Sequence, residues 1–392
     1  MRLGRRLFSA LLALSLTPLA ACKKPGDDGS GAGPAGSTGG GTEIRIGHFA
    51  SMTGGTAHFG QDTDKAAHLA VDEANATGGV LGKKVKLITL DDRGDSAEAA
   101  NAVTRLIDVE KVNAILGEVA SSLSLAGGRV VQRRGIPMVS PSSTNPKVTE
   151  VGDFIFRVCF IDPFQGKVMA NFARKNLKFD KVAILKDVKN DYSIGLADAF
   201  KQAFTSQGGT IALEQSYSQG DTDFSAQITA IKGSGAQAIF VPGYYAEVGA
   251  IARTAQRLGV KVPLMGGDGW DAPDLYKIGG DALEGSYFSN HFALDMVTPK
   301  AQKFIADFKA KYGQEPTGLG ALGYDAAAVL FDAMKRAGSV EPKAVRDALA
   351  ATKDYEGVTG KITIDPQRNA QKSAVVLKIT GGKSKFESVV EP

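Results

Sequence analysis

The sequence is poor in cysteine, in histidine and in unbalanced charge, and each shortage excludes a class of protein. Only two cysteines occur, Cys22 and Cys159, which excludes a framework of several disulfides. The four histidines show no metal-type spacing, no HExxH motif occurs, and no glycine-rich loop ends in Gly-Lys-Ser or Gly-Lys-Thr. We therefore expect neither a metal site nor a cofactor.

The charge balance gives no reason to expect a nucleic-acid partner. The formal net charge is +4, and Arg2, Arg5 and Arg6 supply three of these charges in a segment that we expect to be removed. The remaining chain, at about +1, lacks the basic excess that binds phosphate backbones. If Cys22 is modified, Cys159 has no disulfide partner, and we expect it to be a small buried residue rather than a reactive thiol.

The N-terminus, "MRLGRRLFSALLALSLTPLAAC", has the basic start and apolar stretch of a secretory signal. Its apolar run from Leu7 to Leu16 is too short for a membrane span. "LAAC" resembles the lipobox of bacterial lipoproteins, which implies cleavage after residue 21 and attachment of lipid to Cys22. Residues 22–42 are rich in glycine and predict a flexible tether. Its root-mean-square end-to-end distance should be about 25 Å. We thus expect an exported protein anchored by lipid on the periplasmic face of a membrane.

From Glu43 onward, short apolar strands alternate with helical patterns. Such alternation indicates parallel sheets that helices cover on both faces. About ten strands are too many for one sheet of this kind, so the sequence predicts an α/β fold with two doubly wound lobes. The clearest strands are "EIRIGHF", "KKVKLITLDD", "VNAIL", "GIPMVS", "KVAILKD", "AQAIFVPG" and "VPLMGG".

Small polar and aromatic residues follow five of these strands, at the edge where open parallel sheets bind ligands. They are Ser121, Ser122, Ser142, Ser143, Thr144, Tyr192, Tyr244, Tyr245, Asp268, Trp270 and Asp271. Hydroxyl and N–H groups at the start of a helix suit a carboxylate, because the helix dipole is positive there. Any one of these residues alone is more simply explained as a helix cap. The pattern at five strand ends nevertheless favours a binding site.

The residue types at these strand ends indicate the chemistry of the ligand. Hydroxyl groups suit a carboxylate, and the acid Asp268 suits an ammonium group. Phe59, Tyr192, Tyr244 and Trp270 offer walls for an apolar group, although aromatic residues more often lie in a core. The sequence therefore predicts a site for a zwitterion that carries a side chain.

Several motifs at these strand ends resemble those of one known family. They include "GEVASS", "SPSSTNP", "FRVCFIDPFQG", "GYYAEVGAIARTAQRLG" and "GGDGWDAPDL". Their order and spacing look like those of the branched-chain amino-acid type of substrate-binding protein, the extracytoplasmic receptor of ABC importers. The resemblance runs from about Glu43 to the C-terminus. It implies a monomeric type I periplasmic binding fold that binds an amino acid, has an ABC permease as partner and is not an enzyme.

The resemblance also implies three crossovers between the lobes. We place them near residues 160–162, 287–291 and 357–361. Lobe I is then expected to comprise residues 43–160 and 290–357, and lobe II residues 161–289 and 358–392.

The resemblance implies a role for each matching residue in binding the amino-acid head group. Ser121 matches the serine that holds the ligand carboxylate. Ser142 matches a position whose backbone carbonyl binds the ammonium. Thr144 matches a threonine that binds the head group through its backbone and its hydroxyl. Asp268 matches an acid that pairs with the ammonium.

The other matching residues are aromatic. Tyr192 and Tyr244 match residues of the second lobe that close over the ligand, and Phe59 lines the side-chain pocket in the matching family. Three departures from the family pattern occur: the disulfide near the first strands is missing, Asp268 replaces a glutamate, and Phe59 replaces a tyrosine. Trp270 is an addition that either narrows the pocket or stacks on a ligand.

Three alternatives compete with an amino-acid receptor for transport. The same fold can serve as a sensor subunit of a membrane regulator, or can bind an amide or a small organic acid. A serine hydrolase using Ser121 or Ser122 with Asp268 is disfavoured, because we expect no histidine at a strand end where it can act as a base.

Overall fold

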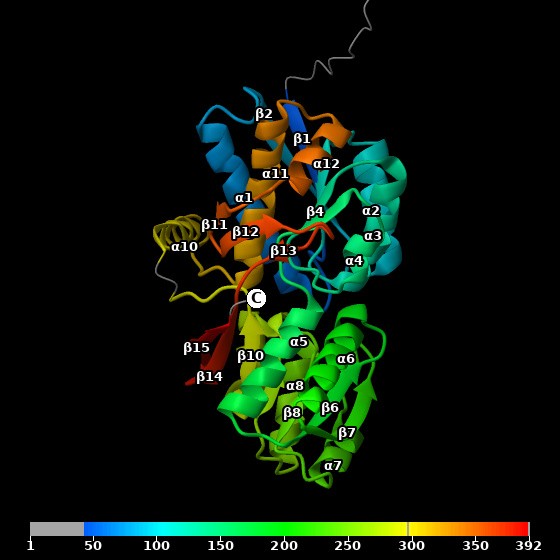
Figure 1. Ribbon diagram of the computed structural model, residues 1–392, viewed down its shortest axis with the longest axis vertical. Coiled ribbons are helices and arrows are strands. Elements are labelled where there is room, and N and C mark those ends of the chain that lie inside the picture. Colours follow the sequence, from blue (N-terminus) through cyan, green and yellow to red (C-terminus); the bar gives the residue numbers. More distant parts are fainter. Residues whose placement is uncertain (1–42, 296–297, 391–392) are drawn as a thin grey trace, which may run out of the picture. The chain divides into compact units, whose positions relative to one another are not determined.

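The computed structural model describes residues 43–295 and 298–390 (Figure 1). The predicted signal segment, Cys22 and the tether lie outside the described residues. Among the helices that the structure describes, none combines the length and the hydropathy that crossing a membrane requires.

Lobe I is built on a five-stranded parallel sheet with the strand order β2-β1-β3-β4-β5. Its strands are β1 (Glu43–Ala50), β2 (Lys84–Asp91), β3 (Ala114–Leu116), β4 (Met138–Ser140) and β5 (Ile155–Arg157). Its helices are α1 (Ala57–Ala76), α2 (Ser96–Asp108), α3 (Ser121–Arg134), α4 (Lys147–Glu150), α10 (Pro299–Tyr312), α11 (Gly318–Ala337) and α12 (Pro342–Ala350). Helix α1 packs against α11, and α2 packs against α3, so helices cover both faces of the sheet (Figure 1).

Helix α2 illustrates how the sequence determines an element of this lobe. The Asp95 carboxylate accepts hydrogen bonds from the N–H groups of Ala97 and Glu98, which makes Asp95 the N-terminal cap of the helix. The apolar residues from Ala99 to Leu106 that recur at helical spacing are buried against the sheet. The helix therefore begins and faces inward as the sequence predicts.

Lobe II is built on a seven-stranded sheet with the order β15-β14-β10-β9-β8-β6-β7. Its strands are β6 (Lys181–Asp187), β7 (Thr210–Tyr217), β8 (Ala238–Phe240), β9 (Leu264–Gly266), β10 (Tyr287–Asn290), β14 (Ala374–Thr380) and β15 (Lys383–Val390). Its helical segments are α5 (Asp162–Asn171), η1 (Phe172–Asn176), α6 (Asp191–Ser206), α7 (Ser225–Lys232), α8 (Tyr245–Arg257), η2 (Asp268–Trp270), α9 (Pro273–Gly279) and η3 (Gly280–Leu283).

The last two strands of lobe II differ from the parallel arrangement that the sequence predicts. Strand β14 pairs antiparallel with β10, and β15 pairs antiparallel with β14. The hairpin between them turns at Gly381 and Gly382, whose φ angles of 62° and 71° lie in the left-handed region that glycine adopts at little cost. The remaining pairs in this sheet are parallel.

Three crossovers join the two lobes. The first connects β5 to α5, and the second follows β10. The third was predicted at residues 357–361, but that segment belongs to a separate small sheet of β11 (Tyr355–Gly357), β12 (Gly360–Ile364) and β13 (Ala370–Gln371). Hydrogen bonds attach this sheet to lobe I: Ile364 N–H donates to the Thr352 carbonyl, and Arg157 N–H donates to the Arg368 carbonyl. The chain therefore reaches lobe II later than predicted, between Gln371 and Ala374.

Candidate functional site

The lobes meet at the carboxyl ends of their parallel strands, which is the edge predicted to hold the site. Ser122, which follows β3, accepts a hydrogen bond from Asp191 N–H at 3.0 Å, and its Oγ donates to Asp191 Oδ2 at 3.0 Å. Asn145 Nδ2 donates to the Asp191 carbonyl at 2.7 Å. Further along, Gly318 N–H donates to Asp271 Oδ2 at 2.6 Å. Hydrogen bonds thus connect the strand ends of one lobe to those of the other.

A small cavity lies between these strand ends. Its lining residues from lobe I are Val119, Ser142 and Leu319, and those from lobe II are Tyr192, Tyr244, Asp268 and Gly269. The cavity has a volume of about 10 Å³, roughly the space that one water molecule needs. Four of the eight predicted site residues therefore line one cavity, and any larger ligand requires the lobes to separate first.

The start of α3 carries the groups predicted to bind a carboxylate. Ser121 is the first residue of this helix, and the residue before it is Ala120, whose side chain cannot cap the helix. No side chain caps this helix start. The Ser121 Oγ instead accepts a hydrogen bond from Asn145 N–H at 3.2 Å. That bond places the Ser121 hydroxyl beside Thr144, the residue before Asn145. Both hydroxyl side chains are buried, next to a positive helix end that favours an anion.

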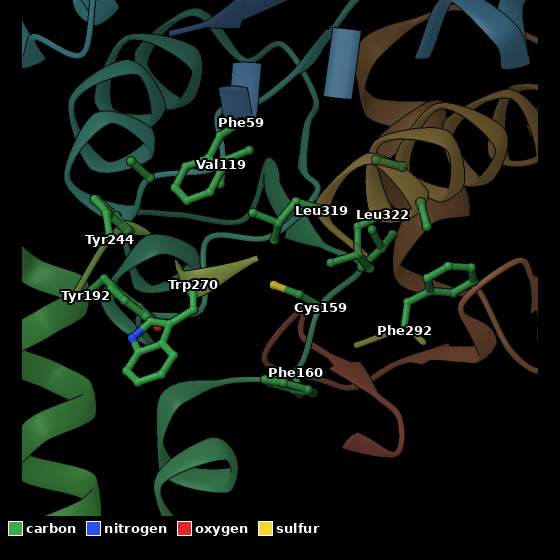
Figure 2. Close-up of a cluster of buried hydrophobic side chains, with 14 of the residues drawn as sticks. Phe59, Val119, Cys159, Phe160, Tyr192, Tyr244, Trp270, Phe292, Leu319 and Leu322 are labelled. Atoms are coloured by element: carbon green, nitrogen blue, oxygen red, sulfur yellow. The ribbon is translucent and has the colours of Figure 1, made fainter. Parts of the chain in front are cut away.

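Two tyrosine rings line the cavity, and the ring of Phe59 packs against one of them. The rings of Tyr192 and Tyr244 stack with centroids 5.4 Å apart and an interplanar angle of 6°. Phe59 meets Tyr244 edge-on at 5.5 Å, and Figure 2 shows these rings close to Val119 and Leu319. Val119 and Leu319 add apolar surface that the sequence analysis missed, because each looks like an ordinary core residue in its own element.

Trp270 occupies a different place from the pocket wall that was predicted. Its Nε1 donates a hydrogen bond to the Val241 carbonyl at 2.9 Å, and its ring packs 5.9 Å from that of Phe288. The indole lies flat against Gly266, where a Cβ atom would come within 2.1 Å of the ring. In Figure 2 the indole points away from Phe59. The structure therefore does not support Trp270 as a ligand contact, because this buried ring belongs to the core of lobe II.

The Asp268 carboxylate is held by two side chains that the sequence analysis did not identify. Gln165 Nε2 donates to Asp268 Oδ1 at 2.8 Å, and His291 Nε2 lies 3.0 Å from Asp268 Oδ2. All three side chains are buried. Burial lowers the pKa of His291, with Asp268 acting in the opposite direction. Burial thus favours the neutral ring, and a neutral ring with its proton on Nε2 donates to the acid.

A second acid, Asp162, lies at the start of α5. Its N–H donates to the Thr144 carbonyl at 3.0 Å, which ties the first crossover to the strand end that carries Thr144. Burial raises the pKa of Asp162 to about 8, and the charge of Asp268 acts in the same direction. At neutral pH the site therefore retains a proton on Asp162.

Comparison with known proteins identifies the family of this chain. The family model described as periplasmic binding protein matches residues 43–383. The chain belongs to the periplasmic binding protein family. A Leu/Ile/Val-binding protein homologue from Brucella melitensis is 35% identical over 325 residues, which cover 82% of this chain and 87% of that protein.

Solved structures show the same fold. A leucine-binding protein, LivK, from Thermotoga maritima superposes with a TM-score of 0.86 and 43% identity, and the match covers 89% of this chain and 99% of that one. The branched-chain amino-acid transporter substrate-binding protein LivJ from Streptococcus pneumoniae, solved in complex with isoleucine, gives a TM-score of 0.85 and 35% identity. That match covers 89% of this chain and 100% of the other. Membership in this family of transport proteins implies an extracytoplasmic location.

In this periplasmic binding protein, part of the hydroxyl cluster after β4 is structural. Ser140 Oγ and Ser143 Oγ each donate to the Glu118 carbonyl, at 3.0 and 2.9 Å. Ser143 Oγ also lies 2.8 Å from Ser124 Oγ. These bonds fix the loop between β3 and α3, which carries Val119 and Ser121. Ser142 differs, because no group in residues 43–295 or 298–390 hydrogen-bonds to its buried Oγ.

Two buried carboxyl groups, Glu118 of this loop and Asp92 after β2, are linked through a serine. Ser51 Oγ lies 2.9 Å from both Asp92 Oδ1 and Glu118 Oε1. One hydroxyl hydrogen cannot serve two carboxylates, so a proton must be shared within the pair. Burial raises the pKa of Glu118 to about 8 and that of Asp92 to about 6. The loop that positions Ser121 therefore rests on a carboxyl pair that loses a proton near neutral pH.

The expectation that no histidine lies at a strand end is wrong. His291 directly follows β10, a four-residue strand that the sequence analysis did not identify. Its Nε2 is bonded to Asp268, while within the described residues the Ser121 and Ser122 hydroxyls bond to Asn145 and Asp191 rather than to a histidine. The described residues also contain no group of three His, Cys, Asp or Glu side chains arranged to hold a metal ion.

Proposed function

We propose that this periplasmic binding protein captures an α-amino acid with an apolar side chain between its lobes and delivers it to an ABC permease. The observation that carries the proposal is one cavity at which lobe I presents Val119 and Ser142 and lobe II presents Asp268, with Val119 two residues before the start of α3 at Ser121. Hydroxyl groups and a helix N-terminus suit the carboxylate, and a buried acid suits the ammonium. The leucine-binding and isoleucine-bound relatives support the same class of ligand.

Each site residue has a role in this proposal. The ligand carboxylate meets Ser121, the first-turn N–H groups of α3, and Thr144. The ammonium meets Asp268 and the carbonyl of Ser142. Tyr192 and Tyr244 cover the bound head group from lobe II.

The side-chain pocket is apolar in this proposal. Phe59, Val119 and Leu319 are each buried and receive the ligand's side chain. Burying an aliphatic side chain of leucine size against such walls contributes about 1.5–3 kcal/mol, whereas a charged side chain would lose its hydration without gaining a partner. This composition favours leucine, isoleucine and valine over charged amino acids.

Binding requires a hinge motion at the three crossovers. A cavity of about 10 Å³ has no entrance for an amino acid, so the lobes open to admit the ligand and close around it. Closure forms the hydrogen bonds between Ser122 and Asp191 and between Asn145 and Asp191. The closed form is the one that the permease recognises, and the protein acts as a monomer.

The protein is held at the membrane in this proposal by lipid on Cys22, which becomes the first residue after the signal segment is removed. The glycine-rich tether of residues 22–42 then links the lipid to lobe I. The protein is a carrier rather than an enzyme, so the bound amino acid is released unchanged.

A thermal-shift screen of the purified protein against amino acids, amides and small organic acids tests the proposal. A ligand at 100 times its dissociation constant stabilises the folded protein by about 2.7 kcal/mol. We expect apolar L-amino acids to give the largest shifts. A screen in which only amides or organic acids stabilise the protein would contradict the proposed ligand class.

A further inference from the structure

The acid that faces the ammonium group is not held by its own loop. Asp268 lies in η2, and the side chains that contact its two oxygens come from α5 and from the segment after β10. Gln165 lies one turn into the helix that follows the first crossover, and His291 begins the second crossover. The orientation of this carboxylate therefore depends on two of the three connections between the lobes.

Both supporting side chains are themselves fixed. The His291 ring stacks on Phe160 with centroids 3.6 Å apart and an interplanar angle of 25°. Its backbone N–H donates to Asn290 Oδ1 at 2.8 Å. Gln165 is fully buried, and its Oε1 lies near Gly267, where an added Cβ atom would come within 3.0 Å. Neither side chain lines the cavity, so each acts on a ligand only through Asp268.

We propose that His291 and Gln165 are positioning residues for ammonium recognition, an inference that rests on the proposed function. Each donates one hydrogen bond to one oxygen of Asp268. Two donors from outside the cavity stabilise the negative charge of a buried carboxylate. They also fix its plane, so that its remaining lone pairs point toward the ligand. The ligand ammonium then binds a carboxylate that is already oriented, so binding does not have to fix the Asp268 side chain.

The protonation of His291 is part of this arrangement. A neutral imidazole donates to Asp268 without cancelling its charge, whereas an imidazolium would compete with the ligand ammonium for the same carboxylate. Burial lowers the pKa of His291, which keeps the ring neutral. The charged groups that act on the ring are Asp268, which raises its pKa, and Lys372, which lowers it.

Two substitutions at His291 separate positioning from packing. His291→Gln keeps a neutral N–H donor near the position of Nε2, and His291→Phe keeps the ring that stacks on Phe160 but removes the donor. We expect His291→Gln to bind L-leucine within about threefold of the wild-type affinity. We expect His291→Phe to weaken binding about tenfold or more, since a hydrogen bond to a charged group is lost.

A second ligand distinguishes the role in ammonium recognition from a general structural role. The probe 4-methylpentanoate has the carboxylate and side chain of leucine but no ammonium group. His291→Phe should leave its affinity within about threefold of the wild-type value, because the acid has no cation to meet. The matched control is His68→Gln, since His68 is a half-exposed histidine of lobe I that contacts Asp64 within α1 and not Asp268, and it should leave the affinity for both probes unchanged.

Calorimetry of the full protein and its variants decides between the outcomes. The proposal is overturned if His291→Phe binds L-leucine within threefold of wild type, or if it weakens both probes equally. If wild-type protein binds none of leucine, isoleucine and valine, the proposed function fails instead. Gln165→Met provides an independent variant, and it should weaken L-leucine binding in the same selective way.

Discussion

Replacing Asp268 with asparagine removes the charge of the acid while preserving its shape. The structure indicates why the fold should tolerate this change. The variant amide still accepts a hydrogen bond through its oxygen, and its NH₂ group needs an acceptor where a donor now lies. His291 can supply that acceptor by moving its proton from Nε2 to Nδ1. Because Nδ1 is buried without a hydrogen-bond partner in the described residues, the ligand-free variant should fold but lose about 1–3 kcal/mol of stability.

The expected cost to ligand binding is larger. Asp268 is buried and lines the cavity, where the proposed site places it against the ligand ammonium and away from water when the lobes close. Removing one partner of such a charge pair leaves the other unpaired, which costs about 2–5 kcal/mol. The dissociation constant for L-leucine should therefore rise between about 30-fold and several thousandfold. Truncating Phe59 removes mainly apolar contact, about 1.5–3 kcal/mol, so Asp268→Asn should be the more damaging change.

Isothermal calorimetry with L-leucine measures this difference, and a thermal melt of each ligand-free variant controls for folding. If Asp268→Asn is folded and binds within threefold of wild type, the reasoning is refuted. Asp268 would then be a loop acid, and another group would meet the ammonium.

Three further predictions concern closure, pH and attachment. Ser122→Ala removes hydrogen bonds that join the closed lobes. In calorimetry it should weaken L-leucine binding about fivefold, near 1 kcal/mol, while the matched surface variant Ser206→Ala has no effect. Burial raises the pKa of Asp92 on folding, so stability that is present at low pH is lost as the pH rises through the raised pKa. Asp92→Asn should therefore stabilise the protein at pH 8 more than at pH 5 in urea melts, whereas an unchanged pH profile would argue against the shared proton. Cys22→Ala should abolish incorporation of labelled fatty acid and leave L-leucine binding intact; incorporation that persists would show the lipobox interpretation to be wrong.

The elements of the fold that the sequence predicted best are those with a strong local pattern. The alternation of apolar strands and amphipathic helices predicts the parallel sheets of both lobes, and Asp95 marks the start of α2. Strands β14 and β15 were missed, because the antiparallel pairing of β14 with β10, and of β15 with β14, depends on where the chain returns and not on their own residues. The third crossover was placed too early for the same reason, since β12 could join either lobe on its local pattern.

The candidate site was partly predictable because strand ends have a recognisable composition. Ser142, Tyr192, Tyr244 and Asp268 follow buried strands and line one cavity. Gln165 was missed because it lies within a helix, where a polar residue is usually exposed to solvent. Trp270 was overestimated because sequence does not show which way a side chain points from a short helical turn.

Calorimetry of the purified protein with L-leucine, N-acetyl-L-leucine and L-leucine methyl ester tests the central claim most directly. The first probe carries both charges, and each of the others has lost one of them. The proposed site predicts that L-leucine binds and that each blocked form binds at least about tenfold more weakly, because a buried partner is left without its charge. Equal affinity for L-leucine and either blocked form would contradict the claim that this cavity recognises the head group of an α-amino acid.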